Sequence, residues 1–205
     1  MALFGKKNNN RNTANLNSEN IIKNPTVGSK ISRCMVIDGP IRSCEPITID
    51  GKVNGQIECD DCVVISHGAF VSGKIFAKEV IVDGIVEAPI EADSVVVSKN
   101  GLLTGYIIAT DVVIEGKSDG DILAKETLIV KNGADVTTVE VKTQIATIEG
   151  EISGTIIASE IVDLKSSATV DGDIYTDDIQ RTKGATLLGS INRYNEYIEL
   201  EASNS

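Results

Sequence analysis

The sequence predicts an all-β fold, a right-handed parallel β-helix (a solenoid) of about ten turns with 15–18 residues each. Three observations carry this prediction. A heptamer of the form G-x-I-x-A-x-E recurs along the chain, and apolar residues alternate with variable ones inside each copy. Aromatic residues make up only 3% of the 205 residues, so the core must consist of Ile, Val, Leu and Ala in thin layers. We call one turn of this solenoid a rung.

Ten copies of the heptamer follow one another, and their first residues are 15–18 positions apart. The copies are GPIRSCE (39–45), GQIECDD (55–61), GKIFAKE (73–79), APIEADS (88–94), GYIIATD (105–111), GDILAKE (120–126), TTVEVKT (137–143), GTIIASE (154–160), GDIYTDD (172–178) and GSINRYN (189–195). A unit of this length cannot bury an apolar face alone, so neighbouring units must stack.

The third position of the heptamer is Ile in nine copies and Val in the other, and the fifth position is small in most copies. Apolar residues two apart indicate a strand with one buried face, whereas a helix requires spacings of three and four. We therefore expect an interior column of stacked side chains. Between the first and last rungs it contains Ile57, Ile75, Ile90, Ile107, Ile122, Val139, Ile156 and Ile174.

The first position of the heptamer is Gly in eight copies, which is typical of a tight corner. The ninth residue of each unit is apolar in nine of ten copies, so a second strand is expected after the corner, including one at Tyr197. The strict hexapeptide rhythm of left-handed β-helices is missing, which favours a right-handed solenoid. The solenoid is predicted to span residues 34–195.

The N-terminal residues 1–33 form a predicted disordered tail, because they are rich in Asn and poor in apolar residues. They carry six Lys and Arg against one Glu, a net charge of +5, whereas the rest of the chain carries −16. Leu3, Phe4, Lys6 and Lys7 combine apolar and basic character, which suits weak attachment to an anionic membrane surface. A tail without any partner is the alternative. Residues 196–205 are predicted to be an acidic C-terminal tail.

The acidic body is a poor match for nucleic acid, because phosphate contacts require local positive charge. No run of 18 apolar residues and no secretion signal is visible, so a cytoplasmic location is expected. Cys59 and Cys62 form a CxxC pair that could hold zinc. The sequence favours buried structural thiols instead, because Cys59 occupies the small-residue position of its heptamer.

No catalytic, cofactor-binding or metal-binding residue is predicted. His67 is the only histidine and falls among turn residues, and the GKS at 116–118 lacks the preceding Gly of a phosphate-binding loop. The seventh heptamer position is acidic in seven copies, which indicates a solvated corner because a catalytic site would be local. Two alternatives stay open: a β-helical carbohydrate-active or acyl-transferring enzyme, and a monomeric binding module with an acidic face.

An N-terminal MALFGKK, a polar linker and Gly/Ile/Val/Ala rungs without catalytic residues resemble the bactofilins, bacterial cytoskeletal proteins that polymerise without nucleotide. The resemblance implies a right-handed β-helix, filaments formed end to end, and peripheral membrane attachment through residues 1–7. It implies no cofactor and no enzymatic activity.

The ends of a solenoid carry unpaired strand edges, which proteins either cap or pair. No capping helix is visible before the first rung. We therefore predict a non-enzymatic scaffold whose partner is another copy of itself, located in the cytoplasm at the inner face of the membrane. The predicted polymerisation interface contains Ile41 in the first rung, with Ile191, Tyr194 and Tyr197 at the other end.

Overall fold

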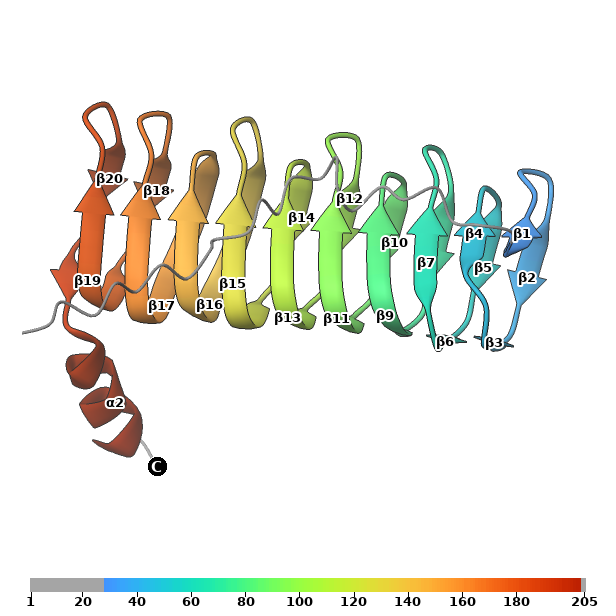
Figure 1. Cartoon of the computed structure of the whole chain (residues 1–205), viewed down its shortest axis with the longest axis horizontal. Helices are drawn as coiled ribbons and strands as arrows, with labels where there is room; N and C mark the ends of the chain where they lie inside the picture. The colour runs from blue at the N-terminus through green and yellow to red at the C-terminus, as the bar shows by residue number, and fades with distance from the viewer. Residues whose placement is uncertain (1–27, 204–205) are drawn as a thin grey trace, which may run out of the picture.

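The computed structural model describes residues 28–203 and shows a parallel β-solenoid of about ten rungs followed by one helix (Figure 1). This confirms the predicted fold class. In Figure 1 the strands facing the viewer run upward while the chain advances from right to left, so the solenoid is right-handed. The elements are β1 (Ser29–Ile31), β2 (Val36–Asp38), β3 (Ile41–Ser43), β4 (Ile47–Ile49), β5 (Lys52–Asn54), β6 (Ile57–Cys59), β7 (Cys62–Ile65), β8 (Phe70–Ser72), β9 (Ile75–Val82), β10 (Ile85–Glu87), β11 (Ile90–Val97), β12 (Leu102–Thr104), β13 (Ile107–Ile114), β14 (Lys117–Asp119), β15 (Ile122–Val130), β16 (Asp135–Ile148), β17 (Glu151–Leu164), β18 (Thr169–Asp171), β19 (Ile174–Arg181), β20 (Thr186–Leu188), β21 (Ile191–Asn192) and α2 (Tyr194–Ser203).

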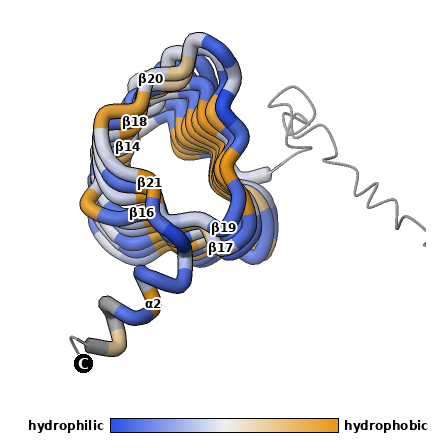
Figure 2. Tube along the Cα trace, turned by 90° about the vertical axis from the view of Figure 1, so that its left-hand side faces the viewer, coloured by the Kyte–Doolittle hydropathy of each residue, from blue (hydrophilic) through white to orange (hydrophobic). Residues whose placement is uncertain are grey.

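Each rung contributes strand residues to three walls, which enclose the core (Figure 2). Wall A contains the start of each heptamer and begins with the pair β3–β6. Wall B follows the next corner and begins with β1–β4, and wall C holds the short strands that begin with β2–β5. From β9 onward one strand runs through the corner between walls A and B: the start of β9 pairs with β6 and its end pairs with β7.

The interior of wall A is a column of Ile residues in register from rung to rung. Ile75 pairs with Ile90, Ile90 with Ile107, and Ile107 with Ile122. Each fully buried side chain of this kind contributes about 1.5–3 kcal/mol. The members of the predicted column that are buried are Ile57, Ile75, Ile90, Ile107, Ile122, Ile156 and Ile174.

The prediction for Val139 is wrong, because this side chain lies outside the solenoid and is 80% exposed. Val141 takes the interior position between Ile122 and Ile156. The ladder between β16 and β17 contains one extra residue between Thr137 and Glu140, and this residue turns Val139 outward. The carboxylate of Asp121 accepts hydrogen bonds from the backbone N–H groups of Val139 and Glu140, both at 3.1 Å, and so holds the bulge in place.

Glycine is favoured at the corner between walls C and A because successive rungs approach each other closely there. Gly120 has a φ of +136°, and a Cβ at this position would lie 2.4 Å from the carbonyl oxygen of Gly105. This distance is far shorter than a non-bonded contact, and the φ value also disfavours any side chain. The corner therefore accounts for the recurrence of Gly at the first position of the heptamer.

The chain leaves the solenoid after β21. The strand predicted at Tyr197 is wrong, because Tyr197 lies in α2, which packs beside wall A next to β17 and β19 (Figure 1). The region predicted as an acidic tail therefore contains helix as far as Ser203. Viewed along the rod in Figure 2, α2 lies outside the ring of strands and leaves the C-terminal end of the solenoid open.

Candidate functional site: the two ends of the rod

The N-terminal end of the rod presents strands that have a partner on one side only. Within the described part of the chain, β1, β2 and β3 pair with β4, β5 and β6, and each leaves its other edge unpaired. Val36 of β2 is 61% exposed and the neighbouring Met35 is also exposed. Ile41, a predicted interface residue, lies in β3 and is half-buried against the core. The first rung therefore combines open main-chain edges with apolar side chains.

Two ion pairs join the first rung to the second. Lys30 Nζ lies 2.7 Å from Asp50 Oδ2, and Arg42 Nε lies 2.8 Å from Glu58 Oε2. The hydrogen bond from Lys30, followed by one from Ser66, lowers the pKa of the Asp50 carboxyl group below its ordinary value. Both pairs are partly open to solvent, so each contributes at most about 1 kcal/mol. They hold the edge rung in the geometry of the rungs beneath it.

The C-terminal end has the same character. Among the described residues, β20 pairs only with β18 and β21 only with β19. Leu188 is 58% exposed and Ile191, the predicted interface residue, is 48% exposed. Asp173 accepts hydrogen bonds from the hydroxyl of Ser190 at 2.7 Å and from its backbone N–H at 2.9 Å, and these bonds lower the pKa of Asp173. They fix the start of the last strand to the rung below.

Tyr194 and Tyr197 lie on the side of the rod. The hydroxyl of Tyr197 donates a hydrogen bond to Glu140 Oε1 at 2.8 Å, and its ring centroid lies 5.6 Å from that of Tyr175. Lys142 Nζ lies 5.3 Å from the centre of the Tyr197 ring. Tyr194 and Tyr197 also line a groove of about 260 Å³ between α2 and wall A. These contacts attach α2 to wall A, so the two tyrosines border the C-terminal end without covering it.

The other residues considered from the sequence lie apart from the rod ends or outside the described range. Leu3, Phe4, Lys6 and Lys7 precede residue 28, where the described part of the chain begins. His67 is exposed in the turn between β7 and β8. Sequence reasoning missed Val36, because its position in wall C holds polar as well as apolar residues in other rungs. It also missed Leu188, although the equivalent residues in the rungs below are polar, such as Asp171 and Ser153. Only their place in a terminal rung makes them interface candidates.

The cysteines divide into two exposed and two buried thiols. Cys34 and Cys44 are exposed in the first rung, and Cys59 and Cys62 are buried. Burial, followed by the charge of Glu79, raises the pKa of Cys62 to about 12, and burial also raises the pKa of Cys59. A buried thiol with such a pKa stays protonated and is a poor nucleophile and metal ligand. Over residues 28–203, no group of three or more His, Cys, Asp or Glu side chains could hold a metal ion.

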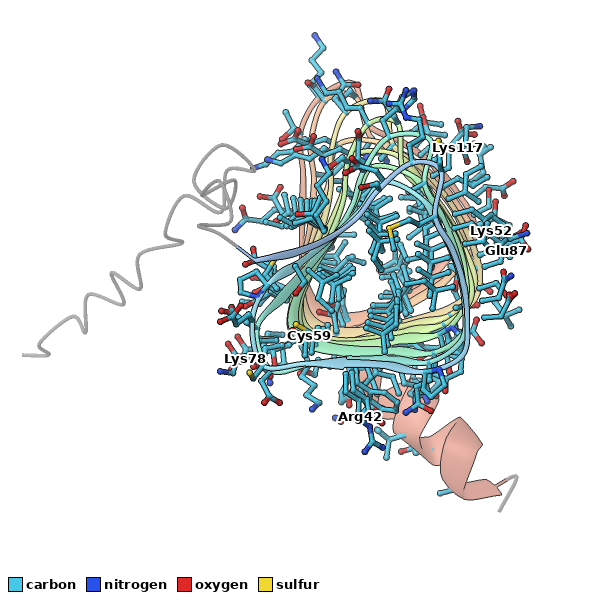
Figure 3. The ribbon with its side chains drawn as sticks, turned by 90° about the vertical axis from the view of Figure 1, so that its right-hand side faces the viewer. Arg42, Lys52, Cys59, Lys78, Glu87 and Lys117 are labelled. Carbon is cyan, nitrogen blue, oxygen red and sulfur yellow. The ribbon has the colours of Figure 1, made fainter. Side chains whose placement is uncertain are left out.

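A groove of about 570 Å³ lies on the side of the first half of the rod. Two of its carboxylates are held in ion pairs between rungs, Glu58 with Arg42 and Glu91 with Lys74 at 3.0 Å. Figure 3 views the rod from its N-terminal end, with Arg42 on wall A and with Lys52, Glu87 and Lys117 on the outside of wall C. Opposite charges in neighbouring rungs pair on these walls, Arg42 with Glu58 on wall A and Lys117 with Asp135 on wall C, as is usual on a solvated surface.

Comparison with known proteins gives one family. The family model for bactofilin, described as polymer-forming cytoskeletal, matches the chain twice, over residues 29–115 and 108–192. The two matches cover both halves of the continuous rod. Neither the curated proteins nor the solved structures contain a match to this chain. Among the described residues, no helix is long and apolar enough to cross a membrane.

Proposed function

This chain belongs to the bactofilin family, and on that premise we propose that it is a cytoskeletal scaffold that polymerises end to end without nucleotide. The observation that carries the proposal is the pair of open rod ends. Within residues 28–203, each end has unpaired strand edges in its last rung together with exposed apolar side chains, Val36 at one end and Leu188 and Ile191 at the other.

End-to-end contact would continue the pattern that holds the rod together. A rung from a second copy, placed about 4.8 Å beyond the last one, would pair the free N–H and C=O groups and bury the exposed apolar side chains. This contact consists of backbone hydrogen bonds and apolar packing, so it requires no hydrolysis of a nucleotide. The family's structural role supports a non-enzymatic function.

We further propose that residues 1–7 tether the filament to the inner face of the membrane. Leu3 and Phe4 would enter the interface while Lys6 and Lys7 contact anionic headgroups. Because β1 begins at Ser29, removal of residues 1–27 leaves the first rung complete. The truncated chain should lose co-sedimentation with vesicles that contain phosphatidylserine and should still polymerise. Equal vesicle binding by the full and truncated chains would contradict the tether.

A charge in a terminal rung tests the polymerisation directly. Ile191→Lys and Ile41→Lys each place an ammonium group where an apolar contact between copies is proposed, so both should shift the sedimentation profile from polymers to short species. Thr110→Lys adds the same charge on an outward mid-rod position and should leave polymers intact. Circular dichroism checks that all three variants keep the solenoid. A stable monomer of the unmodified chain at high concentration and near-physiological salt would favour the monomeric binding module instead.

A further inference from the structure

Wall B has a pattern that the core alone does not explain. In five consecutive rungs it carries three successive apolar residues, at positions 63–65, 80–82, 95–97, 112–114 and 128–130. The first and third residue of each run point inward and are buried. Figure 2 shows the result as a continuous hydrophobic band along one side of the solenoid. Unbroken apolar runs are typical of strands that are covered on both faces.

The middle residues of these runs form a second apolar ladder on the outside of wall B. We call it the outer ladder, and its members are in register through the pairings of β7, β9, β11, β13 and β15. Val96 and Val113 at its centre are 3% and 2% exposed although neither belongs to the internal core. Outward side chains on a solenoid wall normally meet solvent, so this low exposure indicates a covered surface. The outer ladder consists of Val64, Ile81, Val96, Val113 and Ile129.

Carboxylates flank the outer ladder on both sides in two of its five rungs. In the other rungs the flanking residues are polar or basic, namely Cys62 and Ser66, Ser94 and Ser98, and Thr127 and Lys131. Successive side chains of β9 point to opposite faces of the wall, and Val80 and Val82 point inward. Glu79 and Asp83, two residues before and after Ile81, therefore point outward beside it. Asp111 and Glu115 have the corresponding positions beside Val113, two rungs further on. The surface is therefore an apolar strip with carboxylates on both sides at Ile81 and at Val113, and a matching partner would be apolar with basic residues close by.

We propose that the outer ladder is the docking site of the chain's own N-terminal segment, residues 8–27. The described chain begins at this wall, since β1 is the first strand of wall B and pairs with β4. Ile21 and Ile22 precede Ser29 by seven or eight residues, which span up to about 25 Å when extended. The centre of the outer ladder at β11 lies four rungs from β1, about 19 Å along the rod. The two Ile side chains can therefore reach Val96.

Charge favours this occupant over the other candidates. Residues 8–27 carry Arg11 and Lys23 against Glu19, a net positive charge that complements the carboxylates beside the ladder. A second copy docked through the same wall would place carboxylates against carboxylates, and an anionic membrane would be repelled in the same way. Residues 1–7 lie beyond the docked segment and stay available as the membrane tether. The docking itself does not depend on polymerisation.

Photo-crosslinking tests where the segment lies. Ile22→benzoylphenylalanine is introduced into the full chain, and crosslinked peptides are mapped by mass spectrometry in dilute protein. We expect crosslinks within one chain to wall B, at or next to positions 80–82, 95–97 and 112–114. Adding Val96→Lys, which places an ammonium group in the centre of the ladder, should reduce their yield at least fivefold. The matched control is Leu102→Lys, because Leu102 is an outward apolar residue on wall C, and it should leave the yield unchanged.

Binding in trans provides a second, independent readout. A synthetic peptide of residues 1–27 should bind the chain that lacks these residues, bind at least tenfold more weakly to its Val96→Lys variant, and lose affinity as salt rises. Crosslinks spread over walls A and C, or found mainly between chains mixed with isotope-labelled copies, would overturn the proposal. So would a peptide that does not bind, or a truncated rod that pairs laterally through wall B and thereby identifies a second copy as the occupant.

Discussion

Two neighbouring leucines in β12 test whether the structure assigns the inside and outside of a wall correctly. Leu103 is 0% exposed inside the solenoid, whereas Leu102 points outward and is 38% exposed. Replacing either by Ala removes three carbons, worth about 2.4 kcal/mol if they are fully buried. At Leu103 the rungs above and below limit collapse, so the added cavity cost brings the total to about 3–5 kcal/mol. The Leu102 side chain is only about 60% buried, and solvent fills the space that the removed carbons leave. Leu102→Ala should therefore cost about 60% of the full value, about 1.5 kcal/mol.

The assay is thermal unfolding followed by circular dichroism, at a protein concentration low enough that assembly does not stabilise the fold through mass action. For a chain of this length about 1 kcal/mol corresponds to about 2–4 °C, so the two variants should differ in melting temperature by at least 3 °C. Leu103→Ala is the less stable of the two. Equal melting temperatures, or a lower value for Leu102→Ala, would refute the assigned register of wall C.

Three further predictions follow from the corners and from the buried groups. Gly120→Ala should destabilise the rod more than Gly133→Ala in the same thermal assay, because a Cβ at Gly120 lies 2.4 Å from a carbonyl oxygen and one at Gly133 meets nothing within 4 Å; equal losses would contradict the close packing of the corner. Burial, followed by the charge of Asp61, raises the pKa of Glu79 above 4.5, so the folded state binds its proton more tightly than the unfolded state and stability falls as pH rises through the raised pKa. Glu79→Gln should therefore unfold at a higher temperature than the unmodified chain at pH 7.5, with a gap that closes toward pH 4.5; a gap independent of pH would contradict this cause. Iodoacetamide at pH 8 should label Cys34 in the folded chain and Cys62 only after denaturation, because Cys62 is buried with a pKa of about 12; rapid labelling of both would show that the corner is open.

The interior of the rod could be predicted from the sequence because period-2 alternation and a recurring Gly are both local signals. The error at Val139 has a local cause as well. The heptamer alignment placed the corner at Thr137, and its third position is then Val139. In the structure Thr138 takes the place of the corner Gly and one extra residue follows it, so the interior position falls at Val141. Tyr197 satisfied the apolar pattern of a strand, yet Arg193 had already broken the small-residue position, and the chain turned into α2.

The surfaces were harder to predict than the core. Val36 becomes an interface candidate only because no described rung precedes it, and Leu188 only because no described rung follows it. The outer ladder did leave a signal, since wall B has three successive apolar residues in five consecutive rungs. The signal lies in the outward residues of wall B. The repeat alignment was used to find inward residues, so it did not consider them.

The central claim is that copies of this chain polymerise through the ends of the rod, so that the β-rungs stack along the filament. Electron cryomicroscopy of the purified full chain without nucleotide, with diffraction from aligned filaments, tests it most directly. The account predicts filaments with a meridional reflection near 4.8 Å and an axial repeat of about 48 Å per subunit, the length of ten stacked rungs. Strand spacing perpendicular to the filament axis, or a monomer at every concentration, would contradict it.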